Sequence, residues 1–186
     1  MTQNKWIALS YTLPREPSRA RVSVWRKLKK LGAVGIWQSM WVLPGGEENR
    51  RLLSEMKEEV VRCGGEAFTL EFSADKDGEQ LIVDRFTAAR GEEYEELFEQ
   101  CEDFFAEIER ETARQNFSFA EIEENEEELD KLRLWYEKIA ARDTLGSPFG
   151  EKAKAMLAKC AELLDGFCEQ VYAFTELSDE NRGQGA

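Results

Sequence analysis

The chain has 186 residues and a formal net charge of -13, with 38 acidic and 25 basic side chains and no histidine. Apolar residues make up 42% of it and charged residues 34%, which predicts a globular, helix-rich protein with a substantial hydrophobic core. No apolar run reaches the roughly 18 residues of a membrane-spanning helix, and the N-terminal run lacks a cleavage site. We therefore expect a cytoplasmic protein with one domain, or one domain and a large appendage.

The charge is distributed unevenly along the chain. Residues 1–62 contain 12 basic and 6 acidic side chains, whereas residues 63–186 contain 13 basic and 32 acidic ones. The segment SRARVSVWRKLKKLG, residues 18–32, holds six basic residues and no acidic residue. This asymmetry indicates a nucleic-acid-binding face on the first part of the chain. The alternative is that cations and anions pair with each other across the fold.

The first strand and the first helix are predicted from local patterns. Residues 6–13 are aromatic and loosely alternating, as in a strand, and Pro14 and Pro17 end the run. Gly32 is a suitable residue to stop the basic helix that follows. The apolar residues of that helix recur at helical spacing, which predicts a buried stripe with most cations facing outward. They are Ala20, Val24, Leu28 and Leu31, with Trp25 beside them.

The next segments complete a recognisable order of elements. Two short strands flank a turn at Gln38-Ser39, an amphipathic helix covers residues 47–62, and residues 66–72 alternate as a strand. The order βαββαβ is the ferredoxin-like pattern, in which two helices cover one side of four strands. The apolar run QLIVDRF, residues 80–86, predicts one more short strand. We expect this α/β sandwich, with its basic first helix, to occupy residues 1–87.

From residue 88 onward the pattern is helical and acidic. One apolar stripe runs from Tyr94 to Ile108, and Ser118 with Glu121 forms a capping box that opens a second helix. A third helix follows the Gly-Ser-Pro sequence at residues 146–148. These stripes predict a helical hairpin or bundle over residues 88–176, and residues 177–186 are expected to form a disordered tail. The predicted fold class is therefore α+β.

Motifs for catalysis or metal binding are scarce. The four cysteines (Cys63, Cys101, Cys160 and Cys168) have no C-x-x-C spacing, and buried reduced thiols are the expected state. Carboxylate-bridged metal bundles need Glu-x-x-His pairs, and a nucleophilic triad without histidine would need a lysine or carboxylate base. A Gly-rich phosphate loop is also missing. We therefore predict no catalytic residue, no cofactor and no metal, and expect that the protein is not an enzyme.

Two segments resemble one known family. WIALSYTLPREPSRARVSVWRKLKKLGAVGIWQSMWVLP, residues 6–44, resembles the N-terminal domain of the chromate resistance protein B (ChrB) family. FAEIEENEEELDKLRLWYEKIAARDTLGSP, residues 119–148, resembles the acidic helix of the same family. The resemblance implies a transcriptional regulator that binds the operator of a chromate-resistance operon through its basic N-terminal region.

Members of that family also carry a C-terminal domain associated with sensing chromate, which lies beyond the resemblance. We expect either a stand-alone relative, or a chain in which sensing is lost or is performed by another protein. A chromate site within this chain would have to use Arg and Lys side chains.

The first half resembles two other families more distantly. One is the ferredoxin-like C-terminal module of the phenylacetate-pathway repressors, and the other is the small ferredoxin-like nuclease subunit of CRISPR adaptation. The nuclease family places an aspartate directly after the tyrosine of the first strand, whereas Thr12 follows Tyr11 in this chain. A metal-dependent nuclease is therefore the least favoured function.

Two functions of different class remain. The first is a DNA-binding regulator, expected to be a homodimer, whose cations neutralise phosphates and reach base edges. The second is a protein-interaction or assembly module in which the basic helix docks on an acidic surface, such as that of a second copy. The predicted DNA-binding residues are Arg15, Arg19, Arg21, Arg26, Lys27, Lys29 and Lys30.

Overall fold

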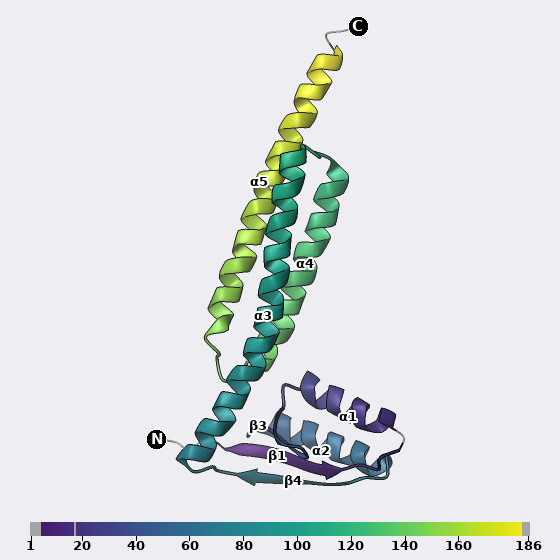
Figure 1. Ribbon diagram of the computed structural model, residues 1–186, viewed down its shortest axis with the longest axis vertical. Coiled ribbons are helices and arrows are strands. Elements are labelled where there is room, and N and C mark those ends of the chain that lie inside the picture. Colours follow the sequence, from purple (N-terminus) through teal and green to yellow (C-terminus); the bar gives the residue numbers. More distant parts are fainter. Residues whose placement is uncertain (1–4, 17, 184–186) are drawn as a thin grey trace. The chain divides into compact units, whose positions relative to one another are not determined.

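The computed structural model describes residues 5–16 and 18–183, with side chains as far as Leu177. Within these residues the fold is α+β, with one four-stranded sheet and five helices (Figure 1). The chain divides into two compact units. The first comprises the residues up to Arg90 together with Arg142–Leu145, and the second comprises Gly91–Ala141 and the residues from Gly146 onward.

The first unit contains the element order predicted from the sequence. Its elements are β1 (Trp6–Thr12), α1 (Ser18–Lys30), β2 (Val34–Trp37), β3 (Met40–Pro44), α2 (Glu47–Arg62) and β4 (Glu66–Phe72). The strands lie in the order β2-β3-β1-β4, and each neighbouring pair is antiparallel. Each helix therefore connects two parallel strands that have a third strand between them. The classification of this unit as ferredoxin-like stays a prediction.

One face of the sheet packs against α1 and α2. Alternate residues of a strand point to the same face, and Ile7 and Leu9 of β1 both point toward the helices. They join Val24 and Leu28 of α1 and Leu53 of α2 in a core where every one of these side chains is at most 2% exposed. The two helices lie side by side over this face (Figure 1).

The opposite face of the sheet is covered by the beginning of α3 (Lys76–Arg114). Trp6 of β1 stacks on Phe86 of α3 with ring centroids 5.8 Å apart, and Ile82 is buried in the same cluster. The prediction of a short strand over residues 80–86 is therefore wrong, because this apolar run forms one face of the helix α3. The sheet is covered on both sides here, and not only on the side of α1 and α2.

The start of α3 is capped by a side chain. Asp75 Oδ1 accepts a hydrogen bond from the backbone N–H of Gly78 at 2.9 Å, which satisfies one of the free donors of the first turn. Asp77 and Glu79 add negative charge to that turn.

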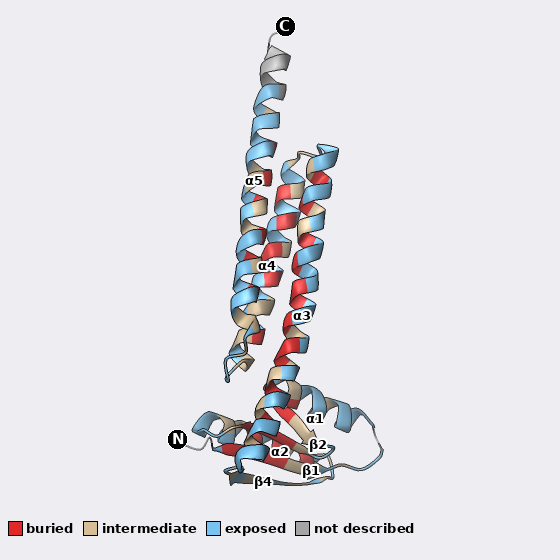
Figure 2. Cartoon of the chain, turned by 60° about the vertical axis from the view of Figure 1, so that its left-hand side comes forward, coloured by how far each residue is buried: buried red, intermediate tan, exposed pale blue. Residues whose placement is uncertain are grey.

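The second unit is a bundle formed by the remainder of α3, α4 (Phe119–Arg142) and α5 (Phe149–Gly183). Its buried residues line the facing sides of the three helices (Figure 2). The predicted cap of α4 is confirmed, since Ser118 Oγ accepts a hydrogen bond from the N–H of Glu121 at 3.3 Å. Residues 177–183, which were expected to be disordered, belong to α5, and residues 184–186 lie outside the described residues.

The cysteines form no disulfide: Cys101 and Cys160 are buried in the bundle, and Cys63 and Cys168 are half-buried. In the described part of the chain, no three Cys, Asp or Glu side chains are grouped as metal ligands would be. Over the same residues, every helix is too polar or too short to cross a lipid bilayer.

Candidate nucleic-acid interface

The helix α1 is held on the sheet by its apolar stripe. Val24 and Leu28 are both fully buried, which turns the opposite side of the helix toward solvent. Gly32 ends the helix as predicted, with a φ of 80° that other residues rarely adopt. The backbone N–H of Ala33 donates to the carbonyl of Leu28 at 3.1 Å, which closes the last turn. The cations of α1 are therefore displayed on a helix fixed at its end and along its length.

The structure places six of the seven predicted cations on α1 and the seventh, Arg15, in the loop before it. Lys29 is half-buried, and the others are exposed: Arg15, Arg19, Arg21, Arg26, Lys27 and Lys30. One helix thus brings together a set of cations with no acidic residue between them.

The pairing of these cations is the main electrostatic feature of the surface. Lys27 Nζ lies 2.6 Å from Glu59 Oε2 of α2, and this ion pair joins the two helices. The other six form no ion pair with any residue that the structure describes. The alternative derived from the sequence, in which cations and anions pair across the fold, therefore applies to Lys27 and not to the other six.

The helix α2 has a different arrangement of charge. Arg50 pairs with Glu47 on its own helix, and its Nε lies 2.6 Å from Glu71 Oε1 on β4. The hydrogen bond from Arg50 holds the pKa of Glu71 below its ordinary value. Arg51 also has two carboxylate partners, Glu48 at 3.2 Å and Glu55 at 3.0 Å.

Two further cations were not predicted as site residues. Lys57 and Arg62 of α2 are exposed and form no ion pair within the described residues. Lys57 differs from Arg50 and Arg51 in having no acidic residue three or four positions away, which is the signal that could have found it, whereas Arg62 has Glu58 and Glu59 at that spacing.

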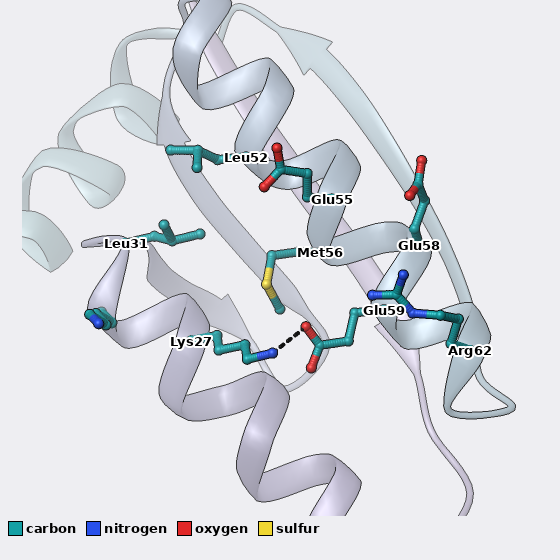
Figure 3. Close-up of a pocket in the computed structure, with 9 residues that line it drawn as sticks. Lys27, Leu31, Leu52, Glu55, Met56, Glu58, Glu59 and Arg62 are labelled. Carbon is teal, nitrogen blue, oxygen red and sulfur yellow. Dashed lines mark hydrogen bonds and ion pairs between the residues drawn. The ribbon is translucent and has the colours of Figure 1, made fainter.

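A groove of about 540 Å³ lies between α1 and α2. Figure 3 shows Leu31, Leu52 and Met56 lining it, with the Lys27–Glu59 ion pair bridging the helices next to Met56. On α1 the groove is bordered by lysines, and on α2 mainly by glutamates. The helical face of the first unit therefore has two kinds of surface. One is the solvent side of α1, whose cations other than Lys27 are unpaired among the described residues, and the other is an apolar groove with rims of opposite charge.

The chain matches one known protein family over most of its length. The model of the family described as "Protein ChrB, N-terminal" matches residues 21–178. The chain belongs to the ChrB N-terminal family. The resemblance seen in the two sequence segments is thereby confirmed, and it places the chain with proteins of the chromate-resistance regulator type. No curated protein matches the chain in a sequence search.

The residues matched by the ChrB family model include only part of the predicted DNA-binding site. The match includes α1 from Arg21 onward, the groove and the whole of α2, whereas Arg15 and Arg19 precede it. The match ends within α5, so it also includes nearly all of the described acidic bundle. Both the basic helix and the acidic helices are therefore part of what the ChrB family has in common with this chain.

Proposed function

We propose that the chain is a DNA-binding transcriptional regulator linked to chromate resistance, that it acts as a homodimer on an operator, and that it is not an enzyme. The observation that carries the proposal is the state of the cations on α1. Five of the six on this helix are free of ion pairs within the described residues, on a rigid helix with no acidic side chain. Membership of the ChrB family supports the link to chromate resistance.

Free cations bind a polyanion better than paired ones. An arginine that is already bound to a carboxylate must give up that partner before it contacts a phosphate. Arg26 and Lys30 have no such partner in the part of the chain that the structure describes. Each cation that neutralises a phosphate releases condensed counterions, so the affinity for DNA falls as salt is added. The acidic side chains after residue 62 oppose binding if they approach the DNA, which makes the free face of α1 the favoured contact.

The test is a salt titration of binding to a fluorescein-labelled duplex from the DNA upstream of the chain's own gene, measured by fluorescence anisotropy. We expect a linear fall of log K with log salt concentration. Arg26→Gln/Lys30→Gln removes two free cations and should reduce that slope by about 1.8, at about 0.9 per phosphate contact. Arg50→Gln/Arg51→Gln makes the same change in net charge on the neighbouring helix and is the matched control, with a nearly unchanged slope.

Three results would contradict the proposal. Wild-type protein that fails to bind the duplex at low salt would remove the function, and equal slope changes in the two variants would remove the role of α1. Cleavage of DNA or RNA in the presence of magnesium would indicate the nuclease alternative.

A second candidate, an assembly module, is favoured by the groove between α1 and α2. Its rims have opposite charge, and a two-fold axis along the groove would place the lysine rim of one copy over the glutamate rim of the other. Apolar Leu31, Leu52 and Met56 would then meet their equivalents, and the lysine rim of α1, Lys27 and Lys30, would be covered. In this assembly Lys30 would not be available to a phosphate of DNA.

Sedimentation velocity without DNA distinguishes the two functions. For the assembly, we expect a dimer at low salt that dissociates at high salt, is weakened by Lys30→Glu and is restored by Lys30→Glu/Glu55→Lys. A dimer that is insensitive to both salt and these substitutions would contradict groove-to-groove assembly.

A further inference from the structure

Two apolar side chains lie on the solvent side of α1, among its cations. Trp25 is 47% exposed and Val22 is 43% exposed. The sequence pattern placed Trp25 beside the buried stripe, but the stripe is complete without it. The indole of Trp25 makes no ring contact and no cation–π contact with any residue that the structure describes. Single exposed apolar residues are common, but two neighbours one turn apart on a cationic helix call for a physical explanation.

The cations are arranged on both sides of this apolar pair. A helix turns by about 100° per residue, so Arg21 lies about 40° to one side of Trp25. By the same geometry, Arg26 lies about 40° beyond Val22 on the other side. Both arginines are exposed and without ion pairs among the described residues.

We propose that Trp25 and Val22 contact base edges in the major groove of duplex DNA, while Arg21 and Arg26 bind phosphates on either side of them. This inference rests on the proposed function and adds the residues that touch the bases. An α-helix fits the major groove, which is about 12 Å wide, and apolar side chains contact the methyl group of thymine there. The 13 residues of α1 span about 20 Å, enough to lie along one groove segment.

The side of α1 that carries the pair supports this placement. Lys27 and Leu31 point toward α2, where Lys27 is bound to Glu59 and Leu31 lines the groove. By helical geometry Trp25 lies on the flank of α1 that faces away from α2. Trp25 and Val22 are therefore accessible to a ligand that approaches α1 without displacing the Lys27–Glu59 pair.

Salt dependence separates the roles of the two kinds of side chain. A phosphate contact contributes to the slope of log K against log salt, whereas an apolar contact contributes equally at all salt concentrations. Trp25→Ala should therefore weaken binding to the upstream duplex by about tenfold at every salt concentration and leave the slope unchanged. Val22→Ala should act in the same direction by about two- to threefold.

Trp37→Ala is the matched control. Trp37 is 70% exposed, more than Trp25, but it lies on β2 and not on α1, so its removal should change neither the affinity nor the slope. Thermal unfolding of each variant, followed by circular dichroism, checks that the fold is retained. We expect both variants to remain folded, because Trp25 and Val22 are each more than 40% exposed.

The outcomes separate this inference from the function on which it rests. Failure of the wild-type protein to bind the duplex overturns the proposed function. Binding that Trp25→Ala and Val22→Ala leave unchanged overturns only the base contact, as does an equal loss in Trp37→Ala. Tighter binding to a single-stranded probe of the same sequence, with the same sensitivity to Trp25→Ala, overturns the placement in a duplex groove.

Discussion

The two helices on one face of the sheet have the same structural role and different electrostatic states. Leu28 of α1 and Leu53 of α2 are both fully buried in the same core. Among the residues that the structure describes, Lys27 of α1 is bound by a glutamate of α2, and the other cations of α1 form no ion pair. In contrast, Arg50 and Arg51 of α2 have two carboxylate partners each.

This difference shows that the number of cations on a surface does not measure how many are available to a ligand. Residues 1–62 contain 12 basic side chains, and three of the four on α2, Arg50, Arg51 and Arg62, have an acidic residue three or four positions away. Neighbours at i,i+3 and i,i+4 on a helix pair readily, and α1 has no acidic residue at any such position. The availability of the α1 cations is therefore a property of the sequence around them.

The largest expected effect tests the part of the comparison in which the helices are alike. Leu28→Ala and Leu53→Ala should each reduce the free energy of unfolding by about 2–5 kcal/mol, because each removes a fully buried side chain from the shared core. Urea denaturation monitored by circular dichroism measures both. A loss below about 1 kcal/mol for Leu28→Ala alone would show that α1 is only loosely attached, and its cations would not be on a rigid face.

A smaller effect is expected when a paired arginine of α2 is made to resemble the unpaired cations of α1. Glu48→Gln/Glu55→Gln removes both partners of Arg51, so Arg51 becomes available to phosphate. We expect the affinity for the upstream duplex to rise by about two- to tenfold and the salt slope to steepen by up to about 0.9. Fluorescence anisotropy at several salt concentrations gives both values.

The control for this variant changes the net charge without releasing an arginine. Glu95→Gln/Glu99→Gln neutralises two exposed carboxylates of α3 in the second unit, and neither of them pairs with a cation in the described residues. An equal gain in affinity for the two variants would mean that net charge alone determines binding, and the distinction between free and paired cations would fail.

The sequence allowed the elements of the first unit to be predicted, but not the long-range partners of its charges. The spacing of Val24 and Leu28 predicted which side of α1 is buried, and the position of Gly32 predicted where the helix ends. The partner of Lys27 is 32 residues away, and that of Arg50 on β4 is 21 residues away. Such contacts depend on the packing of α2 against α1 and β4, which local patterns do not contain.

The incorrect prediction of a strand at residues 80–86 also arose because local patterns do not contain long-range packing. A short apolar run suits a buried strand or one face of a helix, and periodicity alone does not separate the two. The deciding fact is that both faces of β1 are buried, with Ile7 on one side and Trp6 on the other. The sheet needed a second cover, and Ile82 and Phe86 of α3 supply part of it.

The smallest expected effect concerns how the stability contributed by the Arg50–Glu71 ion pair depends on pH. The hydrogen bond from Arg50 lowers the pKa of Glu71 in the folded protein. Desolvation has a smaller effect and raises the same pKa. A carboxyl whose pKa is lowered by folding stabilises the folded protein at pH values above the pKa of that group in the unfolded chain, which is about 4.3 for glutamate. That contribution is lost as the pH falls through the lowered pKa of the folded state.

Glu71→Gln should therefore unfold at a lower temperature than the wild type at neutral pH, by on the order of 1–2 °C, because the pair is at the surface. Below the lowered pKa of Glu71 the two proteins should unfold at the same temperature. Lys30→Gln on α1 is the counterpart and should not change the unfolding temperature at either pH, since Lys30 has no ion pair among the described residues. A difference for Glu71→Gln that persists in acid would assign its effect to packing, and a pH-dependent difference for Lys30→Gln would show that α1 holds a pair after all.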